Sequence, residues 1–380
     1  MKISRKKINK QLKEEKGTCP YCILKIAMNI KSKVEPLIWK ERKLYLLDQR
    51  VIPYEKKYLE LTSYKEVINA IKDMVLRGAP LIGITAVYGF LLGAYEEKKS
   101  SEEIEKFKTK LKSIGEEIKS SRPTAINLNW AVDLLLEKIN NINNIDQIIS
   151  KIEELALWIH EDDKKRCENI GKHGNTLVKN GDNILTICNT GALATGGIGT
   201  AFGVIQTAHE SGKNITVYAC ETRPRQQGAR LTMYELKENN IKCTLVPDTA
   251  CGYLMKNIDI SMVITGADRI AKNGDTANKI GTYQLSILAK EHNIPFYVAA
   301  PLSTFDLSIH TGEDIPIEER HENEVLKING KLICPENSSA FNPAFDVTPS
   351  KHISGIITER GILKSDYLES IEKMFSNVFV

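Results

Sequence analysis

The sequence predicts an α/β protein in which a mostly helical N-terminal part precedes a parallel sheet with helices on both faces. Two observations lead to this fold class. Residues 65–179 carry apolar residues at helical spacing along most of their length. After residue 180, short apolar runs alternate with helical patterns, which is typical of a parallel sheet. A length of 380 residues suits about two domains.

The N-terminal part is expected to be mainly helical, with a strand-like start. A Ser-Arg-Pro-Thr segment is a typical helix start, and it precedes one of the apolar-periodic stretches. The expected elements are two short strands within 34–50, two helices around a turn at 77–80 within 65–97, a charged amphipathic helix at 101–120, an apolar-periodic helix at 121–139, a loop or helix start at 140–147 and a long helix at 147–179.

The C-terminal part is expected to form the parallel sheet. Buried strands are predicted at 184–188, 214–219, 241–246, 260–265 and 295–300, and helices at 195–211, 226–239, 249–256 and 278–292. In such sheets the ligand binds outside the carboxyl ends of the strands. The residues expected to meet there are Cys188, Glu221, Asp248, Asp268 and the loop after Ala300.

Composition and pattern also suggest the domain boundaries. We expect a basic, mobile extension over 1–33, an N-terminal domain over 34–150 and a C-terminal domain over 151–380. Residues 1–30 hold eight Lys or Arg against two Glu, which leaves 44 basic and 46 acidic residues in the rest. Because that remainder is nearly neutral, no nucleic-acid partner is expected.

The chain has no run of about 18 apolar residues, so we expect no membrane span. The apolar segment 22–30 contains a lysine and lacks a small-residue cleavage site, so a cytoplasmic location is expected. The eight cysteines are scattered and are interpreted as reduced thiols. Cys19 and Cys22 form a single C-x-x-C; without a second close pair we expect no zinc there, and the context does not suggest a redox helix.

The segment ILTICNTGALATGG at 184–197 contains the first candidate site. Its glycines match neither a P-loop nor a clean G-x-G-x-x-G, which argues against a dinucleotide. Glycines followed by a helix N-terminus could bind the phosphate of a small substrate. The alternative is that they serve only tight turns and packing. Cys188, at the end of the strand, is either a functional thiol or a small buried residue.

Five further polar residues could carry chemistry. Asp268 ends an apolar strand, where a raised pKa would make it a general acid, although Asp also often caps a helix. Asn278 and Lys279 are expected at the start of a helix, where they could bind phosphate or hydroxyl groups. Arg77 and Arg122 lie in loops leading into helices, and a guanidinium suits phosphate as well as a surface ion pair.

Taken together, several motifs in order resemble one known family. The chain resembles the methylthioribose-1-phosphate isomerases, and more widely the proteins related to the α, β and δ subunits of translation initiation factor 2B, over about residues 35–370. The motifs are RGAPLIG at 77–83, SRPTAINLNWA at 121–131, CNTGALAT at 188–195, ETRPRQQGARLT at 221–232, TGADRIAKNGDTANKIGT at 265–282, VAAPLSTFD at 298–306 and NPAFDVTP at 342–349.

The resemblance implies an aldose–ketose isomerase that converts 5-methylthio-D-ribose 1-phosphate into 5-methylthio-D-ribulose 1-phosphate in methionine salvage. It implies a helical N-terminal domain with a small antiparallel sheet, a Rossmann-like C-terminal domain, a site between them, a homodimer, and neither metal nor cofactor. Cys188 and Asp268 would be catalytic. The substrate-binding residues would be Arg77, Gly78, Ala79, Arg122, Gln227, Asn278 and Lys279.

Three positions depart from the family pattern, namely Ile187, Cys220 and Cys251. Ile187 and Cys220 leave the 5-substituent open, with 5-deoxyribose 1-phosphate and ribose 1,5-bisphosphate as alternative substrates. A non-catalytic regulatory subunit and a nicotinamide dehydrogenase are the alternatives from other classes. The presence of both Cys188 and Asp268 argues against the regulatory subunit, and the glycine spacing argues against the dehydrogenase.

Overall fold

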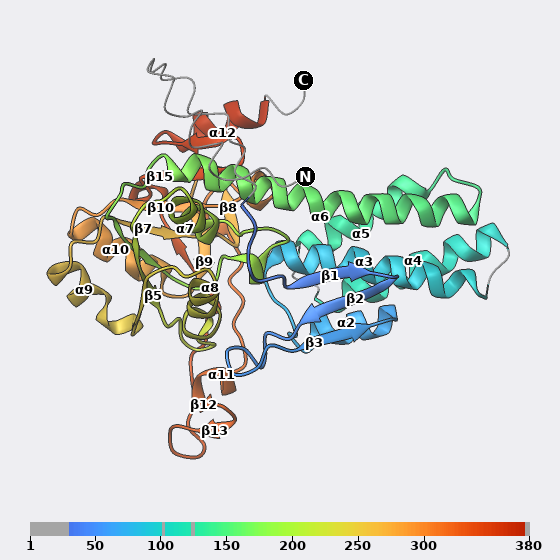
Figure 1. Cartoon of the computed structure of the whole chain (residues 1–380), viewed down its shortest axis with the longest axis horizontal. Helices are drawn as coiled ribbons and strands as arrows, with labels where there is room; N and C mark the ends of the chain where they lie inside the picture. Colours follow the sequence, from blue (N-terminus) through green and yellow to red (C-terminus); the bar gives the residue numbers. More distant parts are fainter. Residues whose placement is uncertain (1–29, 101–102, 123–125, 377–380) are drawn as a thin grey trace, which may run out of the picture. The chain divides into compact units, whose positions relative to one another are not determined.

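A computed structural model of the chain describes residues 30–100, 103–122 and 126–376 (Figure 1). Most of the expected extension 1–33, and with it the Cys19–Cys22 pair, lies outside the described residues. The first elements are β1 (Leu37–Lys40), β2 (Lys43–Leu47), β3 (Tyr58–Leu61), α2 (Tyr64–Lys72), α3 (Ala79–Lys98), α4 (Ile104–Ser120), α5 (Ile126–Ile139) and α6 (Ile145–Asn175).

The N-terminal part contains a three-stranded antiparallel sheet in the order β1-β2-β3. The expected strand pair is β1 and β2, joined by Glu41 and Arg42, whose φ angles of 53° and 59° are those of a two-residue hairpin turn. Strand β3 was not predicted. It is four residues long, and its pairing with β2 is a contact between segments separated by a loop.

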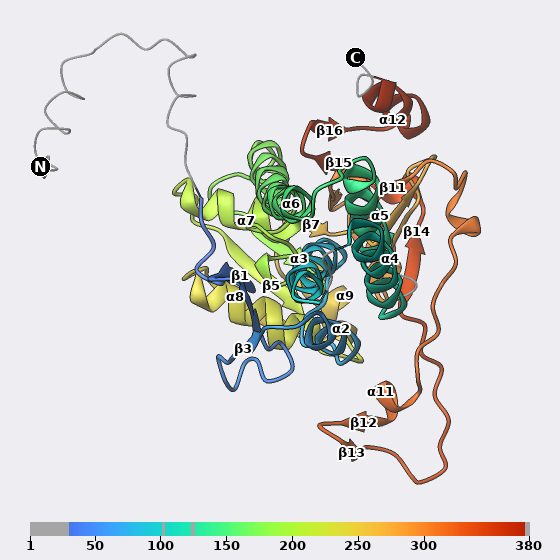
Figure 2. The ribbon, with the colours of Figure 1, turned by 90° about the vertical axis from the view of Figure 1, so that its right-hand side faces the viewer.

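Helix α3 forms the core of the helical part, with α2, α4, α5 and α6 packed around it (Figure 2). An unbroken run of its residues, Leu81–Ala94, is buried. Within the described part of the chain it is the one helix long and apolar enough to cross a membrane, and 78% of that apolar window is buried inside the protein. The expectation that no such apolar stretch exists was therefore wrong, and burial explains its composition.

The C-terminal part alternates strands and helices as expected. Its elements are β4 (Asn183–Thr186), α7 (Ala201–Glu210), β5 (Thr216–Cys220), α8 (Met233–Glu238), β6 (Cys243–Val246), α9 (Cys251–Asn257), β7 (Met262–Thr265), β8 (Arg269–Ala271), β9 (Thr276–Lys279), α10 (Thr282–Glu291), β10 (Phe296–Ala299), β11 (Phe305–Asp306), α11 (Asn323–Leu326), β12 (Lys327–Ile328), β13 (Lys331–Leu332), β14 (Phe345–Thr348), β15 (Gly355–Thr358), β16 (Gly361–Leu363) and α12 (Tyr367–Ser376).

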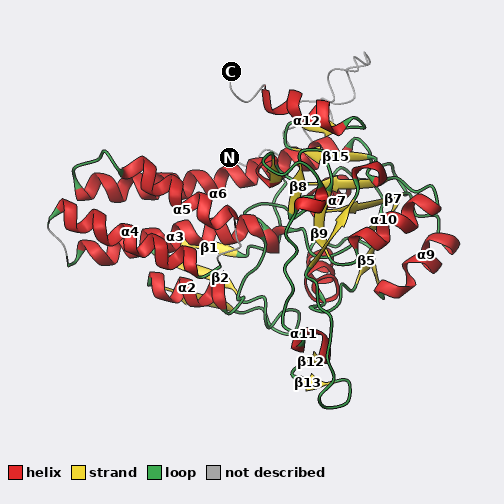
Figure 3. Ribbon diagram, turned by 180° about the vertical axis from the view of Figure 1, so that it is seen from behind, coloured by secondary structure: helices red, strands yellow, loops and turns green. Residues whose placement is uncertain are grey.

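The main sheet has seven strands in the order β16-β15-β10-β7-β4-β5-β6, and all neighbours are parallel except the β15–β16 pair. Helices cover both faces (Figure 3). Ile184 packs with residues of α6, α7 and α8 on one face, whereas the next residue, Leu185, packs with α9, α10 and α12 on the other. This alternation is the period-2 pattern of a strand buried on both sides. The predicted fold class is confirmed.

Two boundary predictions were wrong. Helix α7 begins at Ala201 rather than 195, so the glycine loop is longer than expected. Asn278 and Lys279 lie on strand β9, not at a helix start, because β9 pairs with β8 and with the distant strand β14 in a second, four-stranded sheet. Helix α10 begins after them, at Thr282.

Helix α6 contacts both α3 of the helical part and α7 of the sheet part. Residue 150 falls within this helix, and residues 32–380 form one compact unit. The division at 150 into 34–150 and 151–380 stays a prediction, in which α6 would be common to the two domains.

Candidate active site

Cys188 follows β4 at the carboxyl edge of the main sheet and is 6% exposed. Its φ of +65° is unusual for a residue other than glycine. Two threonine hydroxyls hold this backbone: the Cys188 N–H donates to Thr222 Oγ1 (2.9 Å), and Thr232 Oγ1 donates to the Cys188 carbonyl (2.5 Å). A left-handed backbone costs about 1–2 kcal/mol and persists where its surroundings impose it, often at functional sites.

Thr222 is itself fixed by the next strand end. Its N–H and that of Arg223 donate to the two carboxylate oxygens of Asp248, at 2.9 and 2.7 Å. Glu221 precedes it and donates its N–H to the carbonyl of Val246 on β6. Of the features expected at this edge, Cys188, Glu221 and Asp248 thus meet, and Asp248 supports the thiol through Thr222.

Arg77, in the loop before α3, connects the helical part to the thiol. Its guanidinium donates to Asn189 Oδ1 (2.6 Å) and to the Asn189 carbonyl (2.9 Å), and its Nη2 lies 3.9 Å from Cys188 Sγ. Gly78 allows this approach, because it has a φ of +100° and a Cβ there would lie 2.4 Å from the Ala194 carbonyl oxygen. Ala79 then begins α3.

Asp268 is an exposed residue, and no hydrogen-bond partner of its carboxyl occurs among the described residues. Burial by the wider surroundings nevertheless raises its pKa, against the opposing effects of Lys279 and Arg77. The Asp268 residue is thus accessible while nearby protein atoms still raise the pKa of its carboxyl. A raised pKa is the direction of shift that favours a carboxyl acting as a general acid.

Lys279 is 8% exposed, and its Nζ donates to the Ala344 carbonyl (2.8 Å) and lies 4.4 Å from the centre of the Phe345 ring. Burial lowers its pKa, while the charges of Cys188 and Asp268 oppose that shift. Lys279 therefore lies within electrostatic reach of both predicted catalytic groups. Its neighbour Asn278 is buried and donates from Nδ2 to Thr282 Oγ1 (3.0 Å).

Two predicted binding residues carry buried polar atoms without a hydrogen-bond partner among the described residues, namely Arg122 Nη1 and Gln227 Oε1. Burial lowers the pKa of Arg122, and the nearby Arg320 adds to this effect while Glu318 opposes it. Such atoms cost about 1–3 kcal/mol each unless a ligand satisfies them. Arg122 and Arg320 together would suit an anion.

Sequence reasoning missed Arg320. It lies in the segment that leads to α11, donates to Glu324 (2.7 Å) and acts electrostatically on both Arg122 and Lys279. The surrounding letters IEER at 317–320 look like an ordinary charged surface, so no local signal singles it out.

The glycine loop differs from the expected phosphate cradle. Carboxylates already occupy three of its N–H groups: Glu235 accepts from Ala192 (2.7 Å) and Leu193 (3.4 Å), and Asp163 accepts from Gly196 (2.6 Å). The structure therefore favours the packing alternative for this stretch. The cations that could meet a phosphate come from other segments.

The departures at Cys220 and Cys251 meet in the fold, with their sulfur atoms 3.4 Å apart. All six cysteines in the described ranges are free thiols. The hydrogen bond to Cys251, together with burial, raises the pKa of Cys220. Residues 30–100, 103–122 and 126–376 contain no group of three or more His, Cys, Asp or Glu that could hold a metal ion.

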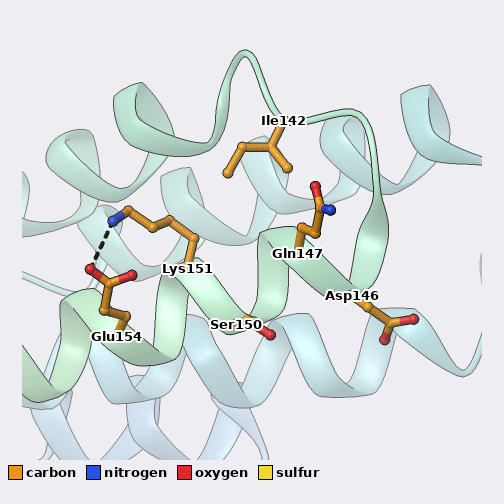
Figure 4. Close-up of a pocket in the computed structure, with 6 residues that line it drawn as sticks. All are labelled: Ile142, Asp146, Gln147, Ser150, Lys151 and Glu154. Atoms are coloured by element: carbon orange, nitrogen blue, oxygen red, sulfur yellow. Dashed lines mark hydrogen bonds and ion pairs between the residues drawn. The ribbon is translucent and has the colours of Figure 1, made fainter.

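Two hollows lie away from the thiol. A cavity of about 230 Å³ is lined from α3, α5 and α6 and by Ser303 of the loop after Ala300. A second, of about 330 Å³, is a shallow surface feature at the start of α6, where Lys151 and Glu154 form an ion pair (Figure 4). The second contains none of the predicted site residues.

Fold and site now define the class of protein. The model of the initiation factor 2 subunit family matches residues 75–365, and the chain belongs to that family. A solved structure described as translation initiation factor eIF-2B, subunit delta, from A. fulgidus is 38% identical, has a TM-score of 0.83, and matches over 90% of this chain and 98% of that one. The β subunit of eIF2B from Chaetomium thermophilum, at 13% identity and a TM-score of 0.50, shares the fold.

More similar relatives specify the branch of the family. Methylthioribose-1-phosphate isomerase of Caldicellulosiruptor saccharolyticus is 53% identical over 87% of this chain and 96% of its own length. The protein of that name from Acetivibrio thermocellus is 53% identical over 90% and 99%. The structure of 5-methylthioribose 1-phosphate isomerase from Pyrococcus horikoshii OT3 is 38% identical, with a TM-score of 0.86 over 92% and 96%. Within its family, the chain groups with these isomerases.

Proposed function

We propose that the protein is an aldose–ketose isomerase that converts 5-methylthio-D-ribose 1-phosphate into 5-methylthio-D-ribulose 1-phosphate, a step of methionine salvage. One observation carries the proposal beyond the relatives' names. Cys188 and Asp268 both act electrostatically on the buried Lys279, and Arg77 lies beside the Cys188 sulfur. A thiol, a carboxyl with a raised pKa and two cations are thus coupled electrostatically, which supports the isomerisation of an anionic sugar at this site.

Asp268 would act first. The phosphate ester at C1 keeps the sugar in its ring form, so the ring oxygen must be protonated before the bond from C1 to that oxygen can break. A carboxyl whose pKa is raised by burial keeps a proton for this step. The pair of electrons of the broken bond stays on the oxygen, which becomes the C4 hydroxyl, and C1 becomes electron-deficient.

A hydrogen must then move from C2 to C1 while the C2 hydroxyl gives its proton back to the Asp268 carboxylate and becomes the ketone. In one route Cys188 removes the C2 proton and returns it to C1. In the other the hydrogen moves directly as hydride, and Cys188 stabilises the charge that develops beside it. In both routes substrate and product have the same atoms, and no external oxidant or reductant is consumed.

Binding of the substrate would use the remaining predicted residues. Arg122, with Arg320 beside it, has an unpartnered buried N–H that supports a role in binding the phosphate. Gln227 offers an unpartnered amide oxygen to a sugar hydroxyl. Asn278, on β9 beside Lys279, would contribute a second amide.

We further propose a cytoplasmic homodimer that needs neither metal nor cofactor and binds neither nucleic acid nor membrane. The basis is the resemblance to the isomerase family. Light scattering during size-exclusion chromatography tests the dimer, and turnover after dialysis against a chelator tests the metal independence.

Turnover of 5-methylthioribose 1-phosphate, followed by NMR, tests the activity, with 5-deoxyribose 1-phosphate and ribose 1,5-bisphosphate as competing substrates. We expect the ketose to form from the first. Running the reaction in D₂O separates the two routes, because proton transfer through Cys188 allows deuterium to appear at C1 whereas hydride transfer does not. Lack of turnover of all three by folded protein would favour the regulatory alternative.

A further inference from the structure

We propose that Glu235 is a positioning residue of this site: its carboxylate fixes the Asn189 amide, and through it the guanidinium of Arg77 beside Cys188. The inference rests on the proposed function for its kinetic consequences. Its structural basis is independent of that function, because it lies in contacts between α8, the glycine loop and the loop before α3.

The Glu235 carboxylate is fully buried, at 0% exposure, and accepts three hydrogen bonds. Asn189 Nδ2 donates at 2.7 Å, and the N–H groups of Ala192 and Leu193 donate at 2.7 and 3.4 Å. Gly191 makes room for it, because a Cβ there would lie 2.3 Å from Glu235 Oε2. The loop after Cys188 is therefore wrapped around this one carboxylate.

The contact with Asn189 determines which way its amide points. An asparagine side chain has one accepting oxygen and one donating nitrogen. Because Nδ2 is committed to Glu235, Oδ1 faces Arg77 and accepts from Nη1 at 2.6 Å. The same guanidinium places Nη2 3.9 Å from the Cys188 sulfur. One amide thus connects Glu235 to Arg77, because it donates to the carboxylate and accepts from the guanidinium.

Thr232 adds a second connection from the same segment. Its hydroxyl accepts from Asn189 Nδ2 at 3.3 Å and donates to the Cys188 carbonyl at 2.5 Å. Thr232 precedes α8, on which Glu235 lies. One short stretch of chain therefore holds both the left-handed cysteine backbone and the amide that orients Arg77.

The charge balance of this network makes it sensitive to pH. The three groups that contact the carboxylate are neutral, and burial raises the pKa of Glu235 to about 7 despite Arg77, the nearby cation. Glu235 in turn acts on the neighbouring Tyr234, whose pKa is raised mainly by burial. Below about pH 7 the carboxyl gains a proton and can no longer accept from all three donors, so the hold on Asn189 weakens.

Glu235→Gln tests the proposal with little change in shape. The new NH₂ group must face one of the donors that the carboxylate accepts from, so the Asn189 amide loses its fixed orientation. We expect kcat/KM for 5-methylthioribose 1-phosphate to fall by roughly 10- to 100-fold, the loss of one charge-assisted hydrogen bond. The decline of wild-type kcat/KM below about pH 7 should also flatten in the variant.

Asp275→Asn is the matched control. Asp275 lies in the turn between β8 and β9 and accepts from the same kinds of donor as Glu235. These are two backbone N–H groups (Ser350 at 2.7 Å, Gly312 at 3.0 Å) and one asparagine amide (Asn273 at 2.8 Å). Its loss should lower stability while leaving kcat/KM and its pH profile near wild type. A thermal melt of each variant checks that both are folded.

The rate at which iodoacetamide alkylates Cys188, followed by peptide mass spectrometry, reports on the contact between Arg77 and the Cys188 sulfur and requires no turnover. A cation beside a cysteine sulfur promotes its reaction with alkylating agents. We expect alkylation to slow several-fold in Glu235→Gln and not in Asp275→Asn. Equal rates in all three proteins would overturn the positioning role, whether or not the wild type is an isomerase. Absence of turnover in the wild type alone would instead overturn the proposed function.

Discussion

The contact between Gly78 and the glycine loop gives the sharpest test of how the two parts of the chain form one site. Gly78 has a φ of +100°, and a Cβ on it would lie 2.4, 2.5 and 2.8 Å from the carbonyl oxygen, Cα and carbonyl carbon of Ala194. All three are backbone atoms, so no side chain can rotate away. Gly78→Ala must therefore push the Arg77 loop away from the Cys188 loop.

Two free-energy costs add in this variant. Alanine at a left-handed φ costs about 1–2 kcal/mol. The displacement adds the loss of packing between the loops and misplaces Arg77, and a shift of about 1 Å at a site can cost on the order of 100-fold in rate. We expect Gly78→Ala to lose more than 1–2 kcal/mol of unfolding free energy and about 100-fold in kcat/KM.

Gly181→Ala separates these costs. Gly181 has a similar φ of +91°, but nothing lies within 4 Å of a Cβ there. Urea unfolding should show the backbone cost of about 1–2 kcal/mol alone, with kinetics unchanged. The contrary result is that Gly78→Ala is no less stable than Gly181→Ala and keeps kcat/KM within twofold of wild type. That result would show that neither stability nor activity requires the close approach of the two loops.

Three further predictions concern the chemical groups. Cys188→Ala should bind substrate but lose nearly all turnover in the NMR assay. Activity within a few-fold of wild type would show that the thiol only packs against its neighbours. Asp268→Asn cannot give up a proton to the ring oxygen, so kcat should fall by at least about 100-fold; a fully active variant would remove the acid assignment. The third concerns stability: the folded-state pKa of Glu235, about 7, exceeds its ordinary value of 4.5. Between pH 4.5 and about 7 the unfolded chain has lost this proton while the folded protein still holds it. The free energy of unfolding therefore falls as pH rises through this range. Wild type should therefore lose up to about 3 kcal/mol relative to Glu235→Gln between pH 4 and 8, measured by urea unfolding, and a pH-independent difference would contradict the raised pKa.

The sequence predicted best where local pattern and topology coincide. The five apolar runs became neighbouring parallel strands, which brings Cys188 to their carboxyl edge. That a ligand binds at this edge stays a prediction. The segment before Thr282 was wrongly predicted, because Asn278 and Lys279 precede a helical pattern and only the distant partner β14 makes them a strand.

Glu235 and Arg320, which support the site residues, could not be predicted from the sequence because their roles depend on distant contacts. Glu235, within MYELKE, looks like an exposed charge on an amphipathic helix. Its burial comes from the glycine loop folding over it, a contact across more than 40 residues. Arg320 likewise meets Arg122 only through the fold. Periodicity identifies a buried face but does not reveal which polar group that face encloses.

An NMR assay of 5-methylthioribose 1-phosphate with wild type and Cys188→Ala side by side decides whether the thiol carries the reaction. We expect wild type to form the ketose and the folded Cys188→Ala protein to bind the sugar without converting it. Conversion at similar rates by both, or by neither, would contradict the claim that this thiol, held at the edge of the sheet beside Arg77, performs an aldose–ketose isomerisation.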